Sequence, residues 1–190
     1  EIWKPLYRYT CLIALGLFKD EADVENSPEQ TFSPNLKPGD IKYKDLNGDG
    51  KIDSNDMTEI GDPTVPQIVY GFGGSMQYKN FDFSVFFQGV AKTSLMMQNI
   101  HPFTSDQTTL LDFIAKDYWT EENPNPNAEY PRLISNLDSH NNFMNSTYWL
   151  RSAAFLRLKN VEIGYDFKKL LLSKVSEIQG LRLYFSGSNL

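Results

Sequence analysis

Two runs of alternating residues on either side of a two-residue turn constrain the fold of this 190-residue chain most strongly. In residues 68–78 and again in residues 81–88, apolar side chains fall mainly on every second position. The shared face carries Ile68, Tyr70, Phe72, Met76, Tyr78, Phe81, Phe83, Val85 and Phe87. Lys79-Asn80 supplies a tight turn, since Asn tolerates the left-handed conformation. Period-two alternation around such a turn predicts an antiparallel hairpin over about residues 68–89.

Two further strands are predicted towards the end of the chain. In residues 148–166 the apolar face shifts by one position at Lys159-Asn160, which predicts a β-bulge there. Residues 181–190 alternate again and are expected to form the last strand. Between these strands, residues 168–178 are expected to form a short amphipathic helix or a turn.

The predicted connections differ greatly in length. Residues 19–66 and 91–147 are polar and contain prolines, and they are expected to be long loops, the second with a short helix at about residues 110–118. Residues 1–18 are expected to form a strand that runs into a turn at Gly16. Loops this long are uncommon in compact domains and usually carry function. Short turns at one end and long loops at the other are typical of outer-membrane barrels, whose long loops are extracellular.

The two faces of the predicted hairpin fit two different environments. One face is aromatic and aliphatic, whereas the other carries Gly71, Gly73, Ser84 and Gln88. In a transmembrane barrel the first face would meet lipid and the second would line the lumen. In a soluble β-sandwich the aromatic face would instead form the core. The pattern predicts an all-β fold and leaves both architectures open.

Composition excludes several classes of function. With a formal net charge of −6, the chain has no basic surface to neutralise phosphates, so nucleic-acid binding is not expected. Cys11 is the only cysteine and lies in an apolar run, so we expect it to be buried and inert. His101 and His140 are the only histidines, which excludes a zinc cluster of Cys and His side chains. Nothing pairs a nucleophile with a base, so we do not expect an enzyme.

Residues 45–56 form the most specific motif in the sequence. Oxygen-bearing side chains occupy loop positions one, three, five, nine and twelve, and Gly50 stands at position six, where a calcium loop turns sharply. The predicted ligands are Asp45, Asn47, Asp49, Asp53, Asp56 and the backbone carbonyl of Lys51. Ile52 is expected to anchor the loop to a core. The flanking residues predict extended chain upstream and one helical turn downstream, so the motif is half of an EF-hand at most. We expect a structural Ca2+ here; the alternative is an acidic surface turn that binds nothing.

A series of short motifs follows one another along nearly the whole chain. They are Gly16-Leu17-Phe18, residues 38–45, Ile60-Gly61-Asp62-Pro63, Tyr70-Gly71-Phe72-Gly73, residues 78–84, Phe87-Gln88-Gly89, Trp119, Tyr130-Pro131-Arg132, residues 155–161, Gly164-Tyr165 and residues 186–190. Each motif is weak alone, but their order and spacing together are specific. In these motifs the chain resembles the C-terminal part of the SusC/RagA family of TonB-linked outer-membrane transporters.

The resemblance implies an architecture and a set of partners. It implies that residues 1–190 supply consecutive strands and two extracellular loops to a transmembrane β-barrel of roughly 22 strands in the outer membrane of a Gram-negative cell. Such proteins import glycans or peptides with energy delivered by TonB, which contacts an upstream part of the chain. A SusD-like surface lipoprotein closes over the barrel. We therefore expect the chain to be part of a longer protein, because a few strands cannot close a barrel.

Two other functions stay open at this stage. One is a soluble extracellular β-sandwich that binds glycans and is stabilised by calcium. The other is a glycosidase with two carboxylates, which the sequence supports least because it gives no reason to choose any pair. Trp119, Tyr130 and Trp149 could stack on sugar rings, although packing within the loops or in an aromatic girdle is the better interpretation.

Overall fold

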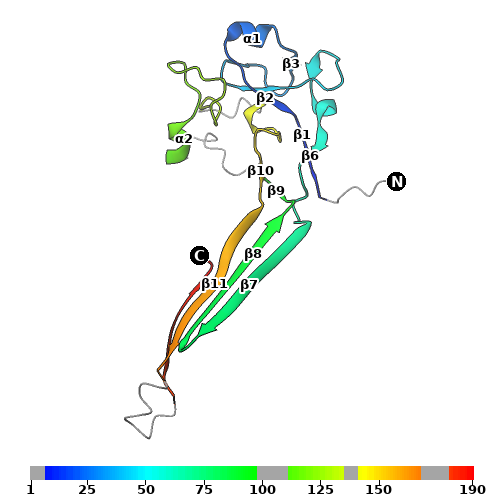
Figure 1. Cartoon of the computed structure of the whole chain (residues 1–190). Coiled ribbons are helices and arrows are strands. Elements are labelled where there is room, and N and C mark those ends of the chain that lie inside the picture. The colour runs from blue at the N-terminus through cyan, green and yellow to red at the C-terminus, as the bar shows by residue number, and fades with distance from the viewer. Residues whose placement is uncertain (1–6, 98–110, 135–140, 168–179) are drawn as a thin grey trace, which may run out of the picture. The chain divides into compact units, whose positions relative to one another are not determined.

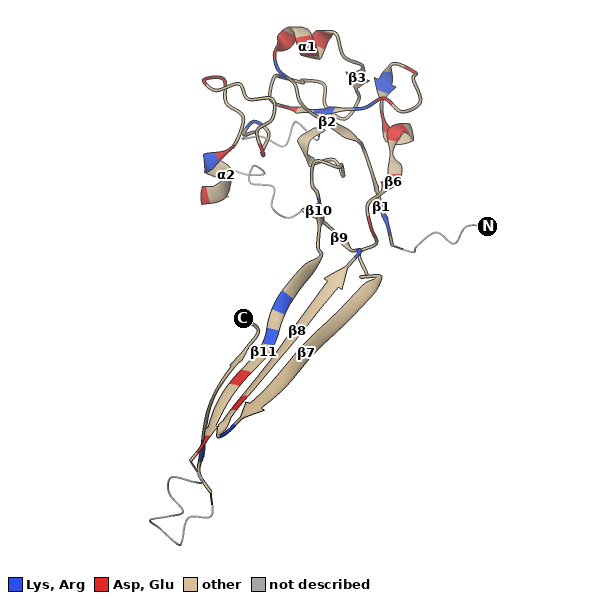
Figure 2. Cartoon of the chain, in the orientation of Figure 1, with Lys and Arg blue, Asp and Glu red and all other residues tan. Residues whose placement is uncertain are grey.

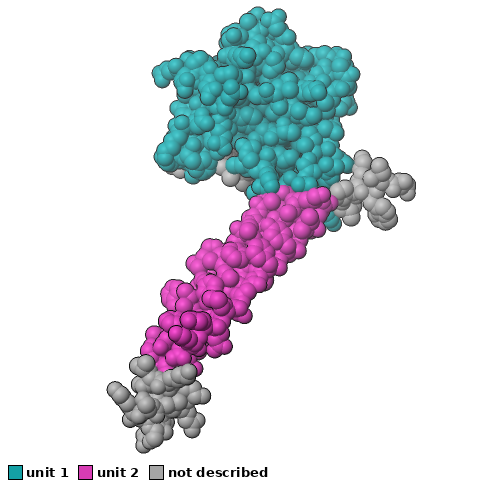
Figure 3. Space-filling view, in the orientation of Figure 1, with its two compact units in different colours: residues 1–64, 94–152 teal, residues 65–93, 153–190 magenta. Residues whose placement is uncertain are grey.

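A computed structural model describes residues 7–97, 111–134, 141–167 and 180–190 (Figure 1). The chain divides into two compact units (Figure 3). Unit 1 comprises residues 1–64 and 94–152, and unit 2 comprises residues 65–93 and 153–190. Each unit is described by itself below. The regular secondary structure of the described residues is mostly strand with few helical turns, so the prediction of an all-β fold is confirmed.

Unit 2 is a single antiparallel sheet with the strand order β12-β11-β8-β7 (Figure 1). Its strands are β7 (Ile68–Tyr78), β8 (Phe81–Ala91), β11 (Phe155–Asp166) and β12 (Arg182–Ser188). The predicted hairpin is present: β7 and β8 pair in register from Ile68 with Ala91 to Tyr78 with Phe81. At the turn the positive φ falls on Lys79 (55°) and not on Asn80, so the left-handed position is the one before the Asn that was expected to supply it.

The predicted bulge in β11 is also present. Pairing with β8 shifts between Leu158 and Asn160, so that one extra residue of β11 faces β8. The bulge keeps apolar side chains on the same face at both ends of the strand, because Leu158 pairs with Phe87 before it and Ile163 pairs with Phe83 after it. The helix or turn expected at residues 168–178 lies outside the described residues.

The register of the sheet separates two chemically different faces. Cross-strand rows on one face are Tyr78-Phe81-Tyr165-Leu183, Met76-Phe83-Ile163-Phe185 and Phe72-Phe87-Leu158. Rows on the other face include Gln77-Asp82-Gly164-Tyr184 and Ser75-Ser84-Glu162-Ser186. This face is mixed, since it also carries Phe86 and the row Val69-Val90-Phe155. The apolar rows are not covered within this unit, since Leu183 is 68% exposed and Phe185 73% exposed. Charged residues are sparse on the sheet and absent from β7 (Figure 2).

Unit 1 is built from short strand pairs and single helical turns. β1 (Tyr9–Cys11) pairs with β6 (Thr58–Ile60), β2 (Ala14–Leu17) with β4 (Ile41–Tyr43), β3 (Glu29–Gln30) with β5 (Lys51–Ile52), and β9 (Ser94–Met96) with β10 (Leu150–Ser152). The helical turns are α1 (Glu21–Glu25), α2 (Asp112–Lys116), η1 (Ser54–Asp56) and η3 (Asn141–Phe143). Within the described part of the chain, no helix is long and apolar enough to cross a membrane.

Two of the predicted strand boundaries need correction. Gly16 does not form a turn; it lies inside β2 with a φ of 123°, where the pairing with β4 shifts between Ala14 and Gly16. Its left-handed backbone accommodates a bulge in the strand, which sequence alone does not distinguish from a turn. Residues 148–166 do not form one strand either, because β10 ends at Ser152 and β11 begins at Phe155.

The segments expected as two separate long loops share one hydrophobic core. Its buried members include Cys11, Leu17, Ile41, Tyr43 and Ile52 from the first part of unit 1, and Ile114, Trp119, Tyr130 and Trp149 from the second. The predicted burial of Cys11 is confirmed, and burial raises the pKa of its thiol. Burial likewise raises the pKa of the Tyr43 phenol. The two segments are therefore halves of one folded body.

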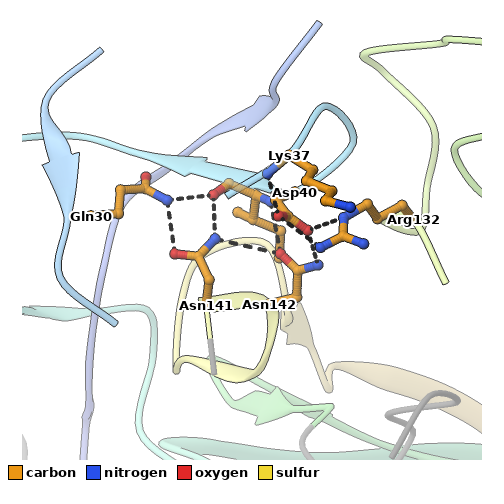
Figure 4. A network of polar contacts seen from close by, with 7 residues as sticks. Gln30, Lys37, Asp40, Arg132, Asn141 and Asn142 are labelled. Atoms are coloured by element: carbon orange, nitrogen blue, oxygen red, sulfur yellow. Dashed lines mark hydrogen bonds and ion pairs between the residues drawn. The ribbon is translucent and has the colours of Figure 1, made fainter. Parts of the chain in front are cut away.

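A buried carboxylate joins these halves. Asp40 is fully buried, and its Oδ1 accepts hydrogen bonds from Arg132 Nε at 2.7 Å and from Asn142 Nδ2 at 2.8 Å (Figure 4). Its Oδ2 accepts from Arg132 Nη2 at 3.1 Å and from the Lys37 backbone N–H at 2.9 Å. Four hydrogen bonds from three segments satisfy this carboxylate, which a buried charge requires.

Side-chain amides extend the network from Asp40 along β4. Asn142 Oδ1 accepts the Ile41 N–H at 2.9 Å, and Asn141 Nδ2 donates to the Ile41 carbonyl at 2.8 Å (Figure 4). Gln30 Nε2 donates to Asn141 Oδ1 at 2.8 Å, while Gln30 Oε1 accepts the Tyr43 N–H at 2.6 Å. These amides do for β4 what a neighbouring strand would do, because they satisfy its backbone groups.

Replacing Asp40 should open unit 1 locally. Asp40→Asn leaves the Arg132 guanidinium without its carboxylate, which we expect to cost about 3 kcal/mol because one partner of a largely buried pair is lost. Hydrogen exchange of the Ile41 amide in the whole protein should then be faster by roughly a hundredfold. Asp62→Asn, which removes an exposed carboxylate, is the matched control and should leave this rate unchanged. An unchanged rate in Asp40→Asn would show that the pair does not hold the two halves together.

Candidate functional site

The loop of residues 45–56 is held between elements of unit 1. β4 ends at Tyr43 before it, and Ile52, in β5, is 1% exposed and belongs to the core. The expected anchoring role of Ile52 is therefore confirmed. The helical turn expected downstream is the 3-10 turn η1, and strand β6 follows it in place of a second helix.

The tip of the loop is organised by oxygen side chains that accept backbone N–H groups. Asp45 accepts from Gly48 N at 2.6 Å and from Gly50 N at 2.9 Å. Asn47 Oδ1 accepts from Asp49 N at 2.8 Å, and Asp49 Oδ1 accepts from Lys51 N at 2.9 Å. Gly50 takes a φ of 82°, as the sharp turn at position six requires. Asn47 and Asp49 are exposed.

The end of the loop closes back on its start through Asp56. This side chain is fully buried, with Oδ1 accepting from Leu46 N at 2.7 Å and Oδ2 from Asp53 N at 2.9 Å. Burial alone would raise the pKa of Asp56, but the N–H groups of Asp53, Leu46 and Asn47 lower it on balance. Asp53 caps η1 by accepting the Asn55 N–H at 2.7 Å.

The fit of this loop to a cation is partial. The six predicted residues lie in one closed loop. The carboxylate oxygens of Asp45, Asp49 and Asp53 accept one hydrogen bond each and retain a lone pair, whereas Asp56 Oδ1 accepts two, from Leu46 N and Asn47 N. However, no group of three or more Asp, Glu, His or Cys side chains within the described ranges converges as a metal centre. Asp53 caps η1 and Asp56 binds backbone N–H groups near the two ends of the loop, while Asp45, Asn47 and Asp49 lie at its tip. Calcium binding at these residues stays a prediction.

The aromatic residues considered for sugar stacking are buried. Trp119, Tyr130 and Trp149 are 6%, 4% and 1% exposed, and Trp149 Nε1 donates to the Asn142 carbonyl at 2.8 Å. A stacking platform must be open to its ligand, so these three side chains are core residues of unit 1. Both histidines, His101 and His140, lie outside the described residues.

The polar face of unit 2 carries a cluster of charged residues that sequence reasoning missed. Arg182 on β12 reaches Asp82 on β8 with Nε at 3.2 Å and Nη2 at 2.5 Å, and it also pairs with Glu162 on β11 at 2.5 Å. Gly164 makes this possible, because a Cβ at that position would lie 2.6 Å from Asp82 and 2.7 Å from Arg182. Only the strand order reveals the cluster, since Asp82 and Arg182 are 100 residues apart.

Comparison with known proteins gives a consistent family assignment. No protein-family model matches the chain. TonB-dependent receptor P26 of Formosa agariphila is 30% identical over 185 residues, covering 96% of this chain and 18% of that protein. TonB-dependent receptor SusC of Bacteroides thetaiotaomicron is 29% identical over 161 residues, covering 85% of this chain and 15% of that protein. The chain thus spans less than a fifth of the length of these relatives.

Solved structures show the same fold. The RagAB peptide transporter matches with a TM-score of 0.66 at 18% identity, covering 96% of this chain and 18% of the matched chain. The RagAB peptide importer in its open-open state matches with a TM-score of 0.63 at 21% identity, covering 99% of this chain and 19% of the matched chain. These relatives are receptors and transporters, not enzymes. The chain corresponds to a region of a TonB-dependent transporter of the SusC/RagA type.

Proposed function

We propose that this chain is part of a TonB-dependent outer-membrane transporter that imports glycans or peptides together with a SusD-like surface lipoprotein. The observation that carries the proposal is the uncovered apolar face of the unit 2 sheet. A water-soluble sheet would hide such a face in a core, whereas a barrel strand presents it to lipid. The RagAB structures, described as a peptide transporter, support this reading of the fold.

The dimensions of the sheet support a membrane-spanning role. β7 and β8 each have 11 residues and β11 has 12, and about 9–11 residues suffice for a tilted strand to cross a bilayer. Within the described residues, β7 and β12 each pair on one edge only, so both edges are open to further strands. Closure into a barrel by other strands of the full protein would satisfy those edges.

The connectivity supports an assignment of the two ends of the sheet. Ile68, Ala91 and Phe155 are the strand ends from which the chain continues towards unit 1, and the register places them at the same end. The two-residue turn at Lys79-Asn80 closes the other end. In the proposed barrel, the short turn is periplasmic and residues 19–66 and 91–147 are extracellular. Unit 1 would then give the lipoprotein or the substrate a preformed surface.

Fractionation of native membranes tests whether the protein is embedded in the outer membrane with a lipoprotein partner. We expect the protein to require detergent and to run as a large species that carries a lipoprotein partner. A detergent-free species near the 21.8 kDa of this chain would instead favour a soluble β-sandwich binding module.

Spin labels on the two faces of β8 test which face meets lipid. Phe83 and Ser84 are adjacent, lie on opposite faces and are both exposed within this unit. With the buried Cys11 first replaced by Ser, a label at Phe83→Cys should collide mainly with oxygen dissolved in lipid. A label at Ser84→Cys should collide mainly with a water-soluble nickel complex. Protection of position 83 from both reagents would identify the apolar face as a protein core and contradict the barrel.

We also propose that residues 45–56 bind a structural calcium ion. Asp45, Asn47, Asp49 and the Lys51 carbonyl would supply oxygen ligands at the tip. Asp53 and Asp56 would supply the remaining oxygen ligands from the end of the loop. The ion would stiffen this part of unit 1 and would take no part in chemistry. The positive φ of Gly50 and the buried anchor Ile52 support the proposal.

Calcium titration tests this second proposal. Calcium at about 1 mM, within the range of extracellular modules, should slow hydrogen exchange in residues 45–56 of the chelator-treated protein. Asp49→Asn should abolish this effect because a charged ligand is lost, whereas Asp62→Asn should preserve it. Equal exchange with and without calcium would leave the loop as an acidic surface turn.

A further inference from the structure

The loop tip contains the only Asn-Gly pair of the sequence, Asn47-Gly48, and both residues are exposed. An Asn side chain can be attacked by the backbone nitrogen of the next residue, and glycine leaves that nitrogen unhindered because it lacks a Cβ. We propose that the folded loop promotes this reaction, so that Asn47 is a site of self-catalysed deamidation.

Asp45 is placed to act as the base. Gly48 N, the attacking atom, donates its hydrogen to Asp45 Oδ1 at 2.6 Å. This distance is slightly shorter than the roughly 2.7–2.9 Å of a charge-assisted hydrogen bond from nitrogen, and it lies within the range from which a carboxylate accepts a proton during reaction. Gly50 N donates to the other carboxylate oxygen at 2.9 Å and fixes its orientation.

The carbon atom under attack, Asn47 Cγ, is polarised by a hydrogen bond to its carboxamide oxygen. Asn47 Oδ1 accepts the Asp49 N–H at 2.8 Å, so the carboxamide is hydrogen-bonded across Gly48 to the second residue along the chain. As Gly48 N attacks Asn47 Cγ, negative charge develops on Oδ1, and a positioned N–H group stabilises such an oxygen. Asn47 Nδ2, the leaving group, lies 3.0 Å from Asp49 Oδ2, which holds the amide in place.

The reaction balances with water as the only added reactant. A bond forms between Gly48 N and Asn47 Cγ while the Gly48 proton passes to Asp45. The bond from Cγ to Nδ2 then breaks, the proton is returned to nitrogen, and ammonia leaves a five-membered succinimide. Water opens the ring at either carbonyl, which gives aspartate or isoaspartate at position 47. Both products add a negative charge between Asp45 and Asp49, and isoaspartate also lengthens the backbone of the loop.

The test compares folded and unfolded protein in metal-free buffer that contains a chelator, so it does not depend on the calcium proposal. Peptide mass spectrometry follows the replacement of the Asn47 amide nitrogen by oxygen, and isoaspartyl methyltransferase labelling detects the rearranged product. The folded protein should deamidate at Asn47 about tenfold faster than the same protein in urea, since a positioned base contributes roughly 10²–10⁴-fold in optimised sites. Asn55, exposed in the same loop, is an internal reference that should show no such acceleration.

Asp45→Asn separates base catalysis from loop geometry. Its side-chain oxygen can still accept the Gly48 N–H, but it is a far weaker base, so the folded rate should fall to the rate in urea. Asp62→Asn, which removes an exposed carboxylate outside the loop of residues 45–56, should retain the acceleration. A folded rate equal to or below the rate in urea would overturn the proposal, as would an unchanged rate in Asp45→Asn.

Discussion

The buried carboxylate of Asp40 is the interaction on which unit 1 depends. Strand pairs of two to four residues contribute few backbone hydrogen bonds, so they cannot by themselves define a fold. Asp40 compensates by holding Arg132 and Asn142, which lie 92 and 102 residues further along the chain. Without these partners the carboxylate would be an uncompensated buried charge, so the polar network and the hydrophobic core require each other.

Unit 2 is organised differently, because regular backbone pairing defines it, while its side chains decide which face is apolar and favour one register. Its strands are long, and backbone hydrogen bonds are satisfied strand by strand. No described residue of unit 2 covers Phe83, Ile163 and Phe185, and this exposure is the reason why we propose that the face meets lipid. One chain thus combines a body specified by irregular polar contacts with a sheet specified by alternation.

This contrast explains which features could be predicted from sequence. Alternation is local, so the hairpin and the bulge near Asn160 were recoverable from residue order alone. The core of unit 1 was not, because Gln30 and Asn141 lie 111 residues apart and look like ordinary loop residues. Proline-containing, polar segments therefore predict long loops, although Trp119 within them is buried. The loop at residues 45–56 was found by its spacing, but spacing does not show how its oxygens are used.

The ion pairs of Arg182 have a consequence for how the strands can be aligned during assembly. If β12 slid by one residue along β11, Arg182 would turn to the apolar face, away from Asp82 and Glu162. If it slid by two residues, the face would be right but the guanidinium would move by about 7 Å, beyond hydrogen-bond reach. Gly164 permits this alignment, because its missing Cβ leaves room for the contact between Asp82 and Arg182. The cluster therefore favours one register, because only that alignment brings Arg182 within hydrogen-bond reach of Asp82 and Glu162.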